Sequence, residues 1–146
     1  LLKIAGYTPN ALSYDSFGKP HLADGKYISI SHSHQFSAVA VGDSPLGVDI
    51  EWERPKVHRI ASKFLHPSEM TENATDRLRT SQWCIKEAAY KAFGKKGISF
   101  LDAIRTSQMD TENPLAAVAF EGKTVVLKNW LYFWQDYSCA LAIKTE

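Results

Sequence analysis

The segment LGVDIEWERP, residues 46–55, alternates apolar and polar side chains. The apolar members are Leu46, Val48, Ile50 and Trp52. A period of two is typical of a strand that rests one face on the core. The other face carries Asp49, Glu51 and Glu53, with no Lys or Arg between them. Like charges repel and a strand needs no acidic row to fold, so this face calls for an explanation.

The composition is that of a globular protein of one-domain size. A chain of 146 residues can bury roughly 70% of its unfolded surface, and we expect a single domain over residues 1–146. A net charge of +1 gives no reason to expect nucleic acid as a partner. No apolar run approaches the ~20 residues needed to cross a bilayer, so we expect no membrane contact. Two cysteines are too few for a disulfide framework and indicate a reducing, cytoplasmic compartment.

The first third of the chain has the composition of strands and turns. Residues 13–26 are rich in turn formers and are expected to form a loop. Strand-like segments follow, and the turn formers GDSP stand between two of them. This arrangement predicts an antiparallel hairpin of residues 36–41 with residues 46–52.

The middle of the chain has helical spacing. One helix is expected after Pro55, and a longer one from Asp76 to Phe93, where Gly94 would end it. Strand-like runs and turns make up the remainder. The order strands, helices, strands predicts an α+β fold in which an antiparallel sheet packs against two helices.

Asp49 and Glu51 form the first candidate site. On one face of a strand their Cα atoms would lie roughly 6.5–7 Å apart. Carboxylates this close either share a proton or hold a cation, and an oxygen-only pair suits Mg²⁺. The alternative is an acidic face in solvent, answered by nearby Lys or Arg.

The helical stretch WCIKEAAYKAFG, residues 83–94, adds a third carboxylate. Trp83, Glu87 and Lys91 fall on one stripe of a helix. An ordinary exposed Glu–Lys pair would be worth ~0.3–0.5 kcal/mol. The large aromatic ring favours a stripe that meets the protein instead. Glu87 would then join the metal site, and Lys86 and Lys91 would be available to an anion.

The stretch ISISHSHQF supplies hydroxyl and imidazole groups at a strand end. Ser31, His32 and Ser33 suit a phosphate group. Alternatively, His32 and His34 are surface residues or half of a zinc site. Zinc needs three or four N or S ligands, the other histidines are scattered and no C-x-x-C pair exists, so zinc is not expected. A nucleophilic serine is not expected either, because no G-x-S-x-G elbow is present.

Together these motifs resemble the 4′-phosphopantetheinyl transferase superfamily. That family carries a G-[IV]-D-x-[EQ] strand and a later [FW]-x-x-K-E-[AS]-x-x-K helix, here GVDIE (47–51) and WCIKEAAYK (83–91). The stretches GKP (18–20) and SHS (31–33) match the larger branch, which modifies carrier domains of polyketide and peptide synthases. The resemblance runs from about Gly18 to Ile143, and it implies the α+β fold of that family.

The resemblance also implies roles for individual residues. The implied Mg²⁺ ligands are Asp49, Glu51 and Glu87. The implied contacts to coenzyme A are Lys19, Ser31, His32, Lys86 and Lys91. Glu87 would also be the base and Lys91 would stabilise the diphosphate, which makes these two the expected catalytic residues. Lys86 is the weaker candidate, because it points about 100° away from Glu87 around the helix.

The implied reaction transfers the phosphopantetheine arm of coenzyme A, the co-substrate, to a serine of an acyl or peptidyl carrier protein. A metal and a lysine would neutralise the charge of the diphosphate as it breaks, and a carboxylate would accept the serine proton. Two other interpretations stay open. One is a non-catalytic module that binds coenzyme A or a carrier protein. The other is a structural domain whose acidic strand is merely solvated.

The chain departs from the family pattern in two places. Cys84 stands where Ser or Thr is frequent. The larger branch has two similar halves, whereas only 18 residues precede Lys19. Either the chain lacks its beginning, and residues 1–17 are a remnant of the first half, or a homo-oligomer completes the cleft.

Overall fold

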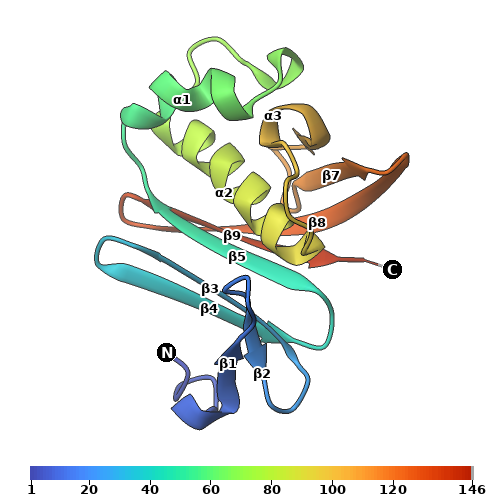
Figure 1. The fold of residues 1–146 in the computed structure, drawn as a ribbon. Helices are drawn as coiled ribbons and strands as arrows, with labels where there is room; N and C mark the ends of the chain where they lie inside the picture. The colour runs from blue at the N-terminus through green and yellow to red at the C-terminus, as the bar shows by residue number, and fades with distance from the viewer. Residues whose placement is uncertain (146) are drawn as a thin grey trace.

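Helix α2 (Asp76–Phe93) lies across one face of a five-stranded antiparallel sheet (Figure 1). This computed structural model describes residues 1–145. The strand order is β5-β9-β8-β7-β6, and the strands are β5 (Leu46–Trp52), β6 (Ile104–Ser107), β7 (Leu115–Phe120), β8 (Lys123–Trp134) and β9 (Tyr137–Lys144). The predicted α+β class is therefore confirmed.

Two small sheets precede the large one. They are β1 (Leu12–Tyr14) with β2 (Pro20–Leu22), and β3 (Tyr27–Ser33) with β4 (Phe36–Gly42). A one-turn 3-10 helix, η1 (Pro9–Ala11), leads into β1. Residues 13–26, expected as loop, thus contain most of a short hairpin.

The predicted hairpin of residues 36–41 with 46–52 is wrong. β4 pairs with β3 instead, through a turn in which His34 has a φ of 49°. β5 pairs with β9, at the other end of the chain. The GDSP turn carries the chain from one sheet to the next, because the free edge of β5 is occupied by serine side chains of β3 rather than by a strand backbone.

The long helix has the predicted bounds because both of its ends are capped. Thr75 Oγ1 accepts a hydrogen bond from the Leu78 amide at 3.1 Å, and Gly94 closes the helix in the left-handed conformation with φ 73°. The predicted helix after Pro55 is α1 (Lys56–Phe64). Two short elements flank α2, namely η2 (Pro67–Glu69) and α3 (Phe100–Ala103). Within the described residues no helix is both long and apolar enough to cross a bilayer.

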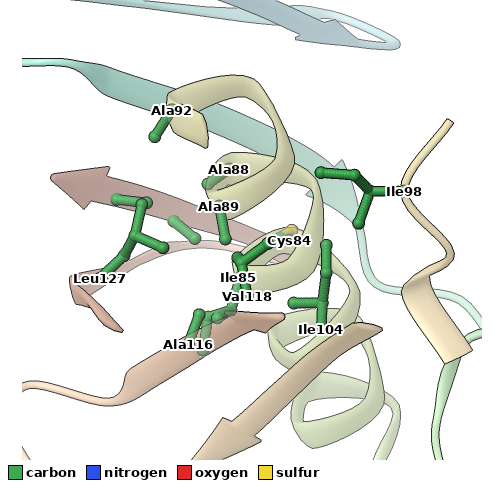
Figure 2. Close-up of a cluster of buried hydrophobic side chains, with 12 residues drawn as sticks. Cys84, Ile85, Ala88, Ala89, Ala92, Ile98, Ile104, Ala116, Val118 and Leu127 are labelled. Atoms are coloured by element: carbon green, nitrogen blue, oxygen red, sulfur yellow. The ribbon is translucent and has the colours of Figure 1, made fainter. Parts of the chain in front are cut away.

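The core lies between α2 and the sheet. Figure 2 shows helix side chains that face those of β7 and β8, and the cluster includes Cys84, Ile85, Ala88, Ala89, Ala92, Val118 and Leu127. Small residues on the helix allow a close approach to the sheet. The approach is close at Gly47 of β5, where a Cβ atom would overlap the carbonyl oxygen of Ala88 and come within 2.9 Å of Lys91 Cβ. The face of β5 that carries the acidic row therefore meets α2.

This contact corrects the expectation of a strand with one face on the core. Residues Leu46 to Ile50 are buried on both faces of β5. Asp49 keeps only 4% of its surface exposed, whereas Trp52 at the strand end is 38% exposed. An alternating sequence does not distinguish water from a polar helix face as the environment of its polar side chains.

Candidate active site

Asp49 of β5 is the centre of the candidate site, where β5 contacts β3 and α2. Its Oδ1 atom accepts hydrogen bonds from Lys91 Nζ at 2.8 Å and from Ser31 Oγ at 2.9 Å. Lys91 Nζ also donates to the Val48 carbonyl at 2.9 Å. The buried Oδ2 atom has no hydrogen-bond partner among the described residues. Burial raises the pKa of Asp49 above its ordinary value, against the attraction of Lys91.

Glu51 and Glu87 form one electrostatic cluster with Asp49. Glu51 Oε2 accepts a hydrogen bond from Ser33 Oγ at 3.1 Å, and burial together with the charge of Asp49 raises its pKa. Burial and the charges of Asp49 and Glu51 raise the pKa of Glu87 to about 7. Glu51 and Glu87 are thus close enough to Asp49 for its charge to disfavour theirs. Lys91 contacts Asp49 directly, and it lowers the pKa of Glu87.

Glu53, the last acid of the row, has a different environment. Its Oε1 atom accepts hydrogen bonds from Arg77 Nε and from Ser138 Oγ, both at 2.9 Å. The alternative of an acid answered by a nearby Lys or Arg thus applies to Glu53 and in part to Asp49, although neither carboxylate lies in open solvent. Within the row Glu53 pairs with Arg77 and Asp49 pairs with Lys91, both residues of α2, while Glu51 has no ion pair among the described residues.

The three clustered carboxylates fit Mg²⁺ in their donor chemistry. They offer oxygen only, they carry more negative charge than Lys91 can balance, and Asp49 Oδ2 is buried without a partner. In the side-chain positions described for residues 1–145, no three His, Cys, Asp or Glu residues converge tightly enough to enclose an ion. Lys91 holds Asp49 in this arrangement.

A basic pocket of about 310 Å³ adjoins the cluster, between the β1–β2 turn and the end of α2. Its four cationic side chains are Lys19, Lys91, Lys95 and Lys96. Lys91 belongs to both places, because its side chain lines the pocket while its ammonium group binds Asp49. An anion in this pocket would lie beside the carboxylates.

The turn that carries Lys19 is ordered by Asp15. Asp15 Oδ1 accepts hydrogen bonds from the amides of Phe17 at 2.8 Å and Lys19 at 2.9 Å. The Lys19 amide and the His21 ring hold the pKa of Asp15 at about 2. Phe17 lies under Lys96, whose Nζ is 4.1 Å from the ring centroid. The two sides of the pocket therefore touch.

A more apolar hollow of about 330 Å³ begins at Glu87. It lies between α1, α2 and α3, and its other lining residues are Ile60, Lys63, Phe64, Trp83 and Phe100. Trp83 packs edge-on against Phe64 with ring centroids 5.0 Å apart. The stripe of Trp83, Glu87 and Lys91 thus meets protein, as predicted. The alternative of an exposed Glu87–Lys91 pair is not what the structure has, because Lys91 binds Asp49.

Of the predicted coenzyme A contacts, Lys19 and Lys91 lie in the basic pocket and Lys86 does not. Lys86 is fully buried on the inner side of α2. Its ammonium group donates to Glu69 Oε2 at 2.7 Å and to three carbonyls, those of Phe64, Phe100 and Ile104. A buried ammonium group with this set of acceptors cannot reach a ligand, so the expected contact of Lys86 with coenzyme A is wrong.

Ser31 and His32 also lie outside the basic pocket. β3 contributes residues 28–30 to the pocket wall. Ser31 is 8% exposed, and its hydroxyl group bonds to Asp49 and to the Ile50 amide. His32 is exposed and, by strand alternation, points away from β5. Sequence reasoning missed Lys95 and Lys96, although the run GKKG after the helix offered two lysines beside its end.

Comparison with known proteins identifies the family to which this chain is similar. The family model described as the 4′-phosphopantetheinyl transferase superfamily matches residues 45–142, from β5 through α2 to β9. A 4′-phosphopantetheinyl transferase of Bacillus subtilis is 31% identical over 104 residues, which are 64% of this chain and 46% of that protein. A 4′-phosphopantetheinyl transferase of Aneurinibacillus migulanus is 31% identical over 87 residues, which are 56% of this chain and 37% of that protein.

The chain spans less than half the length of these curated relatives. The match nevertheless includes the acidic strand and the Lys–Glu helix, the two elements that meet at Asp49. On the strength of the family match, this chain belongs to the 4′-phosphopantetheinyl transferase superfamily.

Proposed function

We propose that the chain transfers the 4′-phosphopantetheine group of coenzyme A to a serine of an acyl or peptidyl carrier protein, with Mg²⁺. The observation that carries this proposal is Lys91, which joins the basic pocket to the buried carboxylate Asp49. Transfer from a diphosphate to a hydroxyl group needs cations beside the diphosphate oxygens and a base beside the attacking hydroxyl group. Two free cysteines suit a reaction in the reducing cytoplasm.

In the proposed reaction the serine oxygen attacks the phosphorus atom that carries the pantetheine arm. The bond from that phosphorus to the bridging oxygen of the diphosphate breaks, and adenosine 3′,5′-bisphosphate leaves with the bridging oxygen. The serine proton passes to Glu87. In the metal-free chain burial and the neighbouring carboxylates raise the pKa of Glu87 to about 7, which suits a general base because such a base works best when its pKa lies near the working pH. A bound Mg²⁺ would lower this pKa.

The other residues of the site bind and neutralise. Lys91, with Lys19 and the two lysines after α2, would hold the phosphate groups of coenzyme A. Asp49, Glu51 and Glu87 would hold Mg²⁺, and a bound Mg²⁺ supplies Lewis-acid neutralisation of the diphosphate oxygens. The apolar hollow beside Glu87 offers a path for the pantetheine arm and the acceptor serine.

The test is incubation of the chain with an apo carrier protein, coenzyme A and Mg²⁺, followed by intact mass measurement of the carrier. We expect the mass of one phosphopantetheine group to be added. Glu53→Gln is the matched control, because Glu53 comes from the same acidic row but pairs with Arg77; it should retain transfer. A folded wild-type chain that modifies none of several carriers would contradict the proposal.

A non-catalytic module that binds coenzyme A is the second candidate. It is favoured by one observation: in the described part of the chain the three carboxylates do not converge on a single point. Calorimetry separates the two functions. Binding of coenzyme A that is unchanged by a metal chelator, together with no transfer, would support the module.

A further inference from the structure

Three serines of β3 form a regular ladder along the free edge of β5. The backbone amides of Val48, Ile50 and Trp52 donate to the Oγ atoms of Ser29, Ser31 and Ser33 at 2.9, 3.3 and 3.1 Å. Each pair is 19 residues apart, so β3 runs parallel to β5. In Figure 1 the β3–β4 hairpin accordingly lies beside β5, on the side away from β9.

The ladder satisfies the amides of an edge strand with hydroxyl groups instead of carbonyls. A carbonyl only accepts hydrogen bonds, whereas a hydroxyl group that accepts one still has a proton to donate. Ser31 donates that proton to Asp49 Oδ1 at 2.9 Å, and Ser33 donates to Glu51 Oε2 at 3.1 Å. Each bond reaches the residue 18 positions further along the chain.

Ser29 repeats the backbone contact without the second bond. The same offset of 18 positions places it opposite Gly47, which has no side chain to accept a proton. The ladder thus contains its own comparison. Ser29 joins the two strands only, while Ser31 and Ser33 join the strands and also hold a carboxylate.

We propose that Ser31 and Ser33 are positioning residues, which orient Asp49 and Glu51 for a divalent cation. This inference rests on the proposed function and gives Ser31 a role beneath the metal ligands rather than at a phosphate. Ser31 and Lys91 both occupy Oδ1 of Asp49, and this leaves the buried Oδ2 without a partner. An oxygen held in this way is available to a cation, and partners of this kind fix the orientation of a ligand before the metal arrives.

The test is direct metal binding by the whole chain without coenzyme A, measured from the electron paramagnetic resonance of free Mn²⁺. Coenzyme A is left out because Ser29, the site of the control variant, lines the pocket proposed for it. We expect Ser31→Ala and Ser33→Ala to weaken Mn²⁺ binding by about 10- to 100-fold, the usual effect of removing such a partner. Ser31→Thr keeps the hydroxyl group and should restore binding. Ser29→Ala loses the same backbone contact as the other two and should bind Mn²⁺ nearly as the wild type does.

Thermal unfolding of each variant accompanies the titration, because a purely structural ladder would lower stability and leave metal affinity alone. Equal Mn²⁺ affinity in Ser29→Ala, Ser31→Ala, Ser33→Ala and the wild type overturns the positioning role but leaves the proposed function standing. Absence of Mn²⁺ binding by the wild type overturns the metal site itself, and with it this inference.

Discussion

Two neighbouring residues of α2, Lys86 and Glu87, show two opposite ways of burying a charge. Lys86 points inward and donates to four acceptors, one of which is Glu69. Glu69 in turn accepts from the His66 amide and from the amide and hydroxyl group of Thr106. Burial opposes the charge of Glu69, but these hydrogen bonds outweigh it and lower its pKa.

The cluster on the other side of the helix is less completely paired. Asp49 raises the pKa of Glu51 and of Glu87, and Glu51 also raises the pKa of Glu87. Lys91 forms an ion pair with Asp49, whose Oδ2 atom has no hydrogen-bond partner among the described residues. The difference teaches how to interpret buried charge in this molecule. When the fold supplies all the partners of a buried charge, removal of one partner costs stability, whereas a buried charge that lacks partners is available to a ligand.

Removing Lys86, on the side of α2 where the buried charges are fully paired, should have the largest effect on stability. Lys86→Met leaves Glu69 buried without its countercharge, and we expect the free energy of unfolding to fall by about 3–5 kcal/mol. Lys26→Met is the control, because Lys26 forms an exposed pair with Asp43 at 3.7 Å and should cost about 1 kcal/mol or less. Chemical denaturation measures both, and equal losses would contradict the comparison.

Neutralising a carboxylate of the incompletely paired cluster should reduce activity while the chain stays folded. Glu87→Gln deletes the proposed base, and we expect phosphopantetheine transfer to slow by about 10²- to 10⁴-fold. Asp49→Asn should also abolish transfer. Glu87 has no ion pair among the described residues, so Glu87→Gln should unfold at or above the wild-type temperature. Asp49→Asn loses the partly exposed ion pair with Lys91 and should lower stability less than Lys86→Met does. A loss of stability like that of Lys86→Met would show that the two sides do not differ.

The pH dependence of stability sharpens the same comparison. The pKa of Glu87 rises from 4.5 to about 7 on folding, so between these pH values the folded chain holds a proton that the unfolded chain has released. Stability of the metal-free chain should therefore fall as the pH rises through this window. Glu87→Gln should reduce the slope, which Asp49 and Glu51 also contribute to. Melting temperatures at pH 5 and pH 7.5 in a chelator measure it, and an unchanged slope in Glu87→Gln would contradict the assignment.

The exposed lysines of the basic pocket should show the smallest effect. We expect Lys95→Ala and Lys96→Ala each to weaken coenzyme A binding by about fivefold or less, because an exposed ion pair contributes up to about 1 kcal/mol. The loss should diminish at high salt. Lys123→Ala, at the exposed start of β8, is the control. Calorimetry that gives all three variants the same affinity would remove these lysines from the site.

The spacing and the capping residue of α2 predicted this helix from the sequence alone. The pairing of β5 depends on contacts between distant parts of the chain, so it could not be predicted in the same way. The bounds of α2 follow from its apolar spacing and from Gly94, and the stripe of Glu87 and Lys91 follows from the helical period. The partner of β5 could not be predicted in this way. Its period of two is the same whether the neighbour is a backbone or a row of serines, and β9 lies near the far end of the chain.

Lys86 was misjudged for a related reason. On a helix a lysine is usually solvent-exposed, and the sequence does not show that four elements meet around this one. A weak signal existed in the buried polar residues one and two turns earlier, Gln82 and Arg79, which share its face. The lysines after Gly94 were missed because only the fold brings them to the Lys19 turn.

Gly47 has a further consequence for how the family's strand motif is interpreted. Glycine is needed at this position because the helix backbone lies so close that even a methyl group would overlap Ala88. The φ angle of Gly47 is not in the left-handed region. Any larger residue must move α2 outward, and the ammonium group of Lys91 would then lose its reach to the Val48 carbonyl, 43 positions away in the chain. The glycine that begins GVDIE thus sets the distance between β5 and α2, and with it the distance between the two motifs that these elements carry.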